Sequence, residues 1–173
     1  MIPSGNRLLF PLIMAATFLA NTAAAFTLDS DEPIKVSANS ARLDDSAGTA
    51  IYTGAVELVQ GSVKLDAERV VLYRSPQGLS RIEASGSPAH YRQPSQDQTA
   101  VINAEALNIT WSAKDSQLTF EREALIEQGG STFRGDVIHY DTVNRVVTAE
   151  GGNSEGTSSG RVEMVIQPRS SGQ

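Results

Sequence analysis

The sequence contains no cysteine and only one tryptophan among its 173 residues. Without cysteine there is no disulfide framework, no thiolate chemistry and no lipid-modified N-terminal cysteine. The two histidines, His90 and His139, form no cluster with acidic residues at metal-ligand spacing, so we expect no metal and no cofactor. No serine lies in a nucleophile elbow, and no glycine-rich loop precedes a helix. The sequence therefore predicts a protein that is not an enzyme.

Basic residues are also in the minority. Lysine and arginine number 14 against 20 aspartates and glutamates, for a formal net charge of −6. Nucleic-acid phosphates require a basic patch, and an anionic membrane surface attracts basic segments. The acidic balance therefore argues against both as partners.

The first 25 residues differ in kind from the rest. Arg7 is the only charged residue among the first 28, and an apolar run of 13 residues, Leu8 to Ala20, follows it. A transmembrane helix needs about 20 apolar residues, which is more than this run offers. The run ends in small residues up to Ala25, a pattern typical of a signal peptide cleavage site. We therefore expect residues 1–25 to be a signal peptide and the mature chain to be exported.

One pattern occurs four times in the remaining chain: apolar, polar, Ala or Gly, an acidic residue or Asn, any residue, apolar, any residue, apolar. The copies start at Val36, Leu65, Ile102 and Phe133, although the first has only Ala at one apolar position. Repetition at this period predicts a stacked array in which no unit buries its own apolar face. Short alternating segments and Gly, Pro, Asn and Asp turns separate the copies, and no helical period is sustained. The fold class is therefore all-β.

Each copy breaks the alternation of a strand. Leu65 and Ala67 share one face, whereas Val70 falls on the other face if alternation is strict. The same break is expected between Ala104 and Leu107 in the third copy. Breaks stacked in successive strands would form a crease, and the sheet would fold into a V with an apolar inside. Spacing alone leaves two alternatives open, an ordinary filled core and an elongated interior that holds an apolar ligand.

Carboxylates recur at one position of the pattern, at Glu68, Glu105 and Asp136. Catalytic or metal-binding carboxylates are one explanation. Stacked like charges more often face solvent, so we interpret these three residues as outward-facing.

Several short motifs occur in an order that resembles a known family. They are Pro33–Ala38, Tyr52–Val56, Ala67–Val71, Gly86–Ala89 and Gly135–Tyr140. Together with the expected signal peptide, they resemble the LptA/OstA family, the periplasmic bridge proteins of lipopolysaccharide transport in Gram-negative bacteria. The resemblance covers about residues 32–168.

The resemblance implies an elongated, slightly open, twisted β-jellyroll over residues 26–168, followed by a polar tail at 169–173. It implies a periplasmic location and an apolar groove that carries the acyl chains of lipopolysaccharide. It also implies head-to-tail stacking, with further copies and with related jellyroll domains of the inner-membrane and outer-membrane transport components. The alternative is an exported structural or adhesive β-solenoid with a filled core and no lipid ligand.

Lipid contacts are expected where alternation places apolar side chains on the inner face. Leu107, Ile109 and Trp111 share such a face, whereas Glu57 and Arg69 should point outward. The full set of expected lipid-binding residues is Ile34, Val36, Tyr91, Leu107, Ile109, Trp111, Ile138 and Tyr140.

Assembly is expected at the first and last strands, because the two ends of an open sheet carry unpaired N–H and C=O groups. Such edges pair with other chains by β-augmentation. The expected edge residues are Ile34, Lys35 and Val36 at one end, and Val162, Met164 and Ile166 at the other.

Overall fold

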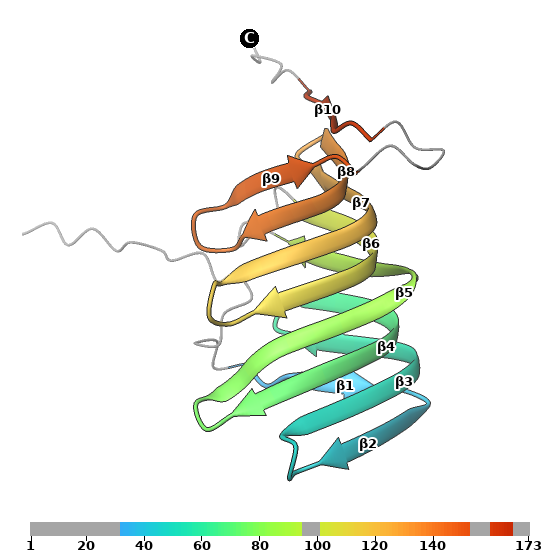
Figure 1. Ribbon diagram of the computed structural model, residues 1–173, viewed down its shortest axis with the longest axis vertical. Helices are drawn as coiled ribbons and strands as arrows, with labels where there is room; N and C mark the ends of the chain where they lie inside the picture. Colours follow the sequence, from blue (N-terminus) through green and yellow to red (C-terminus); the bar gives the residue numbers. More distant parts are fainter. Residues whose placement is uncertain (1–31, 95–100, 153–159, 168–173) are drawn as a thin grey trace, which may run out of the picture.

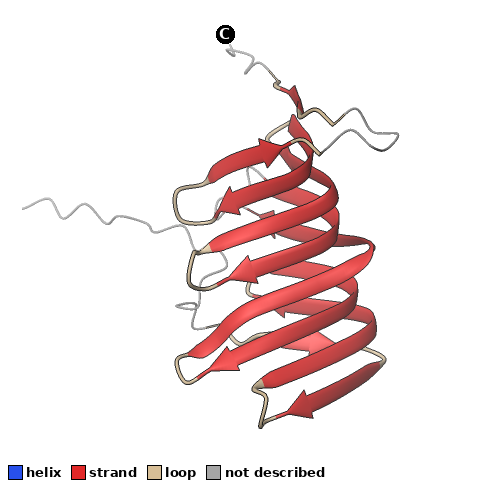
Figure 2. Ribbon diagram, in the orientation of Figure 1, coloured by secondary structure: helices blue, strands red, loops and turns tan. Residues whose placement is uncertain are grey.

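The structure is a computed structural model that describes residues 32–94, 101–152 and 160–167 (Figure 1). The expected signal peptide and polar tail lie outside these residues. The described residues form ten strands and no helix (Figure 2). The strands are β1 (Lys35–Ser37), β2 (Ser40–Asp44), β3 (Thr49–Gln60), β4 (Val63–Ser75), β5 (Gly78–Pro94), β6 (Val101–Ser112), β7 (Gln117–Gln128), β8 (Ser131–Asp141), β9 (Val146–Glu150) and β10 (Glu163–Val165).

All ten strands belong to one antiparallel sheet that follows the order of the chain. The path is β1-β3-β4-β5-β6-β7-β8-β10, while β2 pairs with β3 and β9 pairs with β8. Tight turns join most successive strands, as the turn residues predict. In the turn after β8, Asp141 Oδ1 accepts hydrogen bonds from the backbone nitrogens of Val143 and Asn144, at 2.9 and 2.8 Å. This carboxylate satisfies turn groups that the sheet leaves unpaired.

The predicted crease is present in five successive strand pairs. The register shifts between Thr53 and Val56, Asp66 and Arg69, Ser85 and Ala89, Glu105 and Asn108, and Glu121 and Ala124. Small inward residues flank these shifts, at Ala67, Ala89, Ala106, Ala124 and Gly135. A Cβ added at Gly135 would lie 2.9 Å from the Glu150 carbonyl oxygen, so only glycine fits that close approach.

The crease divides the sheet into two walls that face each other (Figure 1). We call the half with β2 and β9 the front wall, and the half with β1 and β10 the rear wall. The six long strands β3 to β8 contribute one segment to each wall, and the two short strands complete it, so each wall has eight segments. The apolar core lies between the walls, with Phe120, Ile138 and Leu58 fully buried. On the side away from the crease, each wall ends at the turns that join its strands. We call this side of a wall its margin.

The register corrects the alignment of the third copy of the repeat. Leu65 pairs with Tyr91, Tyr91 with Ala104, Ala104 with Ile126 and Ile126 with Phe133. Ala104, rather than Ile102, is therefore the equivalent of Leu65 and Phe133.

Two expectations change with this register. The break in the third copy falls between the buried residues Ala106 and Ile109, so Leu107 takes the outward position that Glu68 and Asp136 occupy in their copies. Leu107 is only partly buried and is not on the inner face with Ile109 and Trp111. Glu105 likewise is not equivalent to Glu68, because it lies in the row that contains Asp66 and Arg134.

Candidate functional site

Two unbroken rows of side chains line the inner face of the front wall, because alternation sends every second residue inward. Register pairs link the members of each row from the first strand to the last. One row is Leu43, Ala50, Leu72, Ile82, Trp111, Leu118, Tyr140 and Val147; the other is Ala41, Tyr52, Val70, Ala84, Ile109, Phe120, Ile138 and Ala149.

The rear wall contributes a matching inner row. Its members are Val36, Leu58, Leu65, Tyr91, Ala104, Ile126, Phe133 and Met164. All three rows are built from aliphatic and aromatic residues, so an apolar surface extends along the whole stack on both walls.

The two walls are in contact in this structure. The rings of Tyr91 and Phe120 meet edge to face, with their centroids 6.0 Å apart. The free space among Leu65, Ile82, Tyr91, Ile109, Trp111 and Leu118 is about 10 Å³. A cavity of that size holds about one water molecule. In these middle strands the interior is therefore filled by its own side chains, and an acyl chain can pass between them only if the walls separate.

The inner rows are uncovered at both ends of the stack. Leu43, at the front-wall end on β2, is 60% exposed, and Met164, at the rear-wall end on β10, is 53% exposed. Both belong to rows whose central members are buried. The apolar interior is thus open toward whatever lies above and below it.

The structure brings most of the expected lipid-binding residues together. Ile34 and Val36 are partly buried and pack against the core, and Tyr91, Ile109, Trp111, Ile138 and Tyr140 are buried. Leu107 is the exception described above. Lipid contact at these positions stays a prediction.

The expected assembly edges are terminal strands of the sheet. β1 contains Lys35 and Val36, and β10 contains Met164, with the exposed residues Val162 and Ile166 on either side. The sequence did not reveal that β2 and β9 are edges too. Each end of the stack thus carries two strand edges that pair with no other described strand, one on each wall.

Among the described residues, polar side chains occupy the inner face of the rear wall only near its margin. Gln60 and Gln93 are both buried, each with 8% of its surface exposed. The Tyr91 hydroxyl donates a hydrogen bond to Gln93 Oε1 at 3.0 Å. Burial raises the pKa of Tyr91, because a phenolate would be poorly solvated there.

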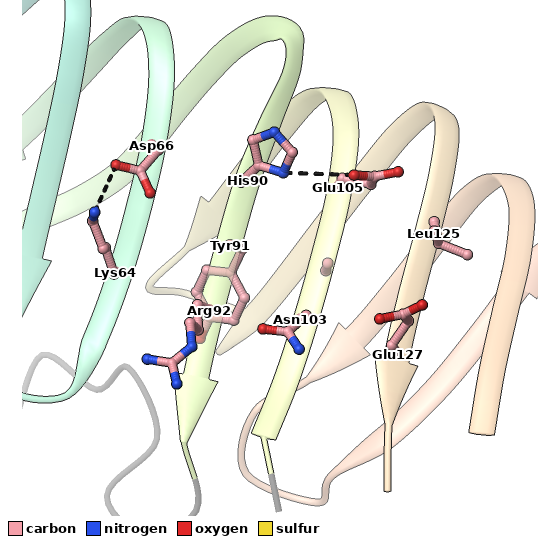
Figure 3. A pocket seen from close by; sticks show the side chains of 10 residues that line it. Lys64, Asp66, His90, Tyr91, Arg92, Asn103, Glu105, Leu125 and Glu127 are labelled. Atoms are coloured by element: carbon pink, nitrogen blue, oxygen red, sulfur yellow. Dashed lines mark ion pairs between the residues drawn. The ribbon is translucent and has the colours of Figure 1, made fainter. Parts of the chain in front are cut away.

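The outer face of the rear wall has a polar cleft of about 530 Å³ (Figure 3). His90 Nδ1 lies 3.5 Å from Glu105 Oε2. Lys64 Nζ lies 3.1 Å from Asp66 Oδ1 and 2.7 Å from Glu57 Oε2. Lys64 donates hydrogen bonds to Glu57 and Asp66, and both raise the pKa of Lys64, the bond to Glu57 having the larger effect. Lys64 and Glu57 pair opposite charges across the neighbouring strands β4 and β3, which is typical of a solvated outer surface. In the described part of the chain, no group of three or more His, Asp or Glu residues is placed to hold a metal ion.

No helix in the described ranges is long and apolar enough to cross a membrane.

The family described as "LptA/(LptD N-terminal domain) LPS transport protein" matches residues 35–146. The chain belongs to this family. LptH of Pseudomonas aeruginosa, a lipopolysaccharide export system protein, is 35% identical over 168 residues, which is 94% of this chain and 96% of LptH. LptA of Escherichia coli K12, with the same description, is 30% identical over 139 residues, covering 78% of this chain and 75% of LptA.

A solved relative has the same fold. The crystal structure of P. aeruginosa LptH, described as the LptA homologous periplasmic component of the lipopolysaccharide transport device, matches with a TM-score of 0.74. The identity is 37%, and the match covers 81% of this chain and 99% of the LptH chain. The elongated, open, antiparallel β-jellyroll expected of the LptA family is thereby confirmed.

Proposed function

We propose that this protein is a periplasmic bridge protein that binds lipopolysaccharide and carries it from the inner membrane to the outer membrane. The observation that carries the proposal is that three apolar inner rows run unbroken along the stack, with an exposed member at each end of it, Leu43 at one end and Met164 at the other. Membership of the LptA family and the likeness to a periplasmic transport component support it. In this proposal, residues 1–25 direct export and residues 26–168 form the jellyroll domain.

The lipid would lie between the two walls. Among the described strands, no hydrogen-bonded ladder joins the walls at their margins, so they can part there while the crease stays intact. The acyl chains would then replace contacts such as that of Tyr91 with Phe120. Burial of an aliphatic side chain contributes about 1.5–3 kcal/mol, so several such contacts hold a lipid without a covalent step. The sequence has no nucleotide-binding motif, and in this proposal an ATPase elsewhere drives the movement.

Strand direction supports head-to-tail assembly. β9 runs from the margin toward the crease, and β2 runs away from the crease. On the rear wall, β10 runs away from the crease and β1 runs toward it. A second copy stacked on the first would therefore add antiparallel strands to both walls. The same edges would pair with related jellyroll domains at either membrane by β-augmentation.

Photo-crosslinking tests the lipid path. A photoreactive amino acid placed at Ile109, Trp111 or Tyr140 should label lipopolysaccharide, whereas the same group at Glu57 or Arg69, on the outer face, should not. Equal labelling at inner and outer sites would contradict the proposed interior path. A complete lack of labelling at all five sites, with lipopolysaccharide in excess, would favour the exported β-solenoid with a filled core.

A further inference from the structure

Three glutamines occupy one structural position on alternate strands of the rear wall. Gln60 ends β3, Gln93 lies one residue before the end of β5, and Gln128 ends β7. Each follows two buried inner residues at two-residue spacing, for example Ala89 and Tyr91 before Gln93. Alternation therefore places all three amides on the inner face, at the margin. Gln93 and Gln128 both pair with Ile102, which sets them two strand spacings apart, about 9.5 Å.

The front wall has no such groups at its inner margin among the described residues. The residues there include Leu79 and Ala113, which pack against the core. The buried Thr142 is also there, and its hydroxyl donates a hydrogen bond to the Ser116 carbonyl oxygen at 2.8 Å. Its donor is thus used within the fold. The Ser80 hydroxyl at this margin likewise donates to the Tyr73 carbonyl oxygen at 3.0 Å. Amide groups therefore line the inner margin on the rear wall, whereas the front margin combines apolar residues with hydroxyls that are hydrogen-bonded within the fold.

Gln93 has a donor to offer. Its Oε1 accepts the hydrogen bond from the buried Tyr91 hydroxyl at 3.0 Å, which fixes the orientation of the amide. The amide nitrogen can donate two hydrogen bonds, and within the described residues it has no partner. A side chain that is 92% buried and presents an uncommitted donor beside an apolar interior is suited to an acceptor that arrives with an apolar ligand.

We propose that Gln93, together with Gln128, binds the carbonyl oxygens of the amide and ester groups that join acyl chains to the polar head of a lipid. Gln60 is less available, because its Nε2 already donates a hydrogen bond to the Glu32 carbonyl oxygen at 3.1 Å. This inference rests on the proposed function, because acyl chains must first lie between the walls. With the chains inside, the boundary between the chains and the head falls at the margin, where the amides lie. The repeat on alternate strands offers equivalent sites along the stack, so a moving lipid passes from one amide to the next.

Two probes separate this inference from the proposed function. One is purified lipid A, which has acyl carbonyls; the other is diphenylhexatriene, a hydrocarbon with no polar atom. In the full mature chain, Gln93→Met should weaken lipid A binding about tenfold and change diphenylhexatriene binding by less than about twofold. Gln117→Met is the matched control, because Gln117 lies at the front margin next to the buried Leu118 and so faces outward. It should change neither affinity.

Other outcomes overturn the inference. An equal loss of both probes in Gln93→Met would make Gln93 a packing residue only, and unchanged lipid A binding would mean that its amide contacts no lipid. If Gln93→Met fails to fold, Gln128→Met, at a partly buried position, is the deciding variant. We expect it to bind lipid A about threefold more weakly. Unchanged lipid A binding in this variant would contradict the inference. Failure of the unaltered chain to bind lipid A would reject the proposed function itself.

Discussion

The rings of Tyr91 and Phe120 meet edge to face across the interior, with centroids 6.0 Å apart and planes at 66°. Tyr91 belongs to the rear wall and Phe120 to the front wall. The contact lies in the middle strands of the stack, between β5 and β7, which are not neighbours in the sheet. It therefore ties the walls together independently of the crease.

Removing one ring should test how far this contact stabilises the closed state. Phe120 is fully buried, so Phe120→Ala loses apolar burial and leaves a cavity. We expect the free energy of unfolding to fall by about 3–5 kcal/mol, measured by urea denaturation. Val146→Ala, at an exposed position of β9, should change it by less than about 0.5 kcal/mol. Similar losses in the two variants would mean that the interior is not the main source of stability.

The corrected position of Leu107 makes a sharp comparison with Ile109. Leu107→Glu places a carboxylate where the second and fourth copies carry Glu68 and Asp136, so we expect a loss of less than about 1 kcal/mol in the free energy of unfolding. Ile109→Glu buries an unpaired charge and should cost more than about 4 kcal/mol, or prevent folding. Thermal and urea unfolding measure both. If Leu107→Glu is as damaging as Ile109→Glu, Leu107 does not face outward and the register of β6 is wrong.

Alkaline pH should destabilise the fold through its buried tyrosines. Burial raises the pKa of Tyr91 and of Tyr140 above the ordinary value of 10.0. A group whose pKa is higher in the folded state stabilises that state fully below the unfolded pKa, and the contribution is lost as pH rises above it. We therefore expect the free energy of unfolding to decline above about pH 10, and to decline less steeply in Tyr91→Phe. Identical slopes between about pH 9 and about pH 12 for the two proteins would rule out Tyr91 as a cause.

The absence of cysteine allows a clean test of stacking. If a second copy continues the front wall, the row that ends at Val147 resumes at Leu43 of the next copy. A mixture of Leu43→Cys and Val147→Cys chains should then form disulfide-linked dimers on mild oxidation, because paired residues in adjacent strands are close enough to bridge. Thr148→Cys faces outward and should not link to Leu43→Cys. Gel analysis under non-reducing conditions distinguishes the pairs, and equal yields from both would contradict this junction.

Much of the fold follows from the sequence, and the exceptions have physical causes. The copies at Val36, Leu65 and Phe133 have the predicted register, because in each only one register places the large apolar residues on the same face. The third copy does not, since Ile102, Ala104 and Ala106 are all buried and fit two registers equally well. Pairing with the neighbouring strands β5 and β7 selects one of the two registers. The sequence of one strand does not show which strands pair with it.

Other features depended on long-range pairing. Gly86 to Pro88 has the composition of a turn between strands, but β5 continues through it and only the register shifts, between Ser85 and Ala89. Glycine and proline interrupt alternation in a turn and in a bend alike. The inward position of Gln93 was also missed, because a glutamine near a strand end has no pattern that separates an inner margin from an outer face.

The closed interior has a consequence for direction. Without a ligand, apolar side chains of the two walls already contact each other in the middle of the stack. A guest must therefore separate these surfaces, and they return to contact as soon as it leaves. The middle sections of the stack thus close again behind the guest and, unlike the exposed ends at Leu43 and Met164, keep their apolar rows out of water while no guest is bound. Closure of the walls favours movement of the lipid toward neither end, so the fold by itself gives the transport no direction. In the proposed pathway, one-way traffic comes from loading at one end and removal at the other.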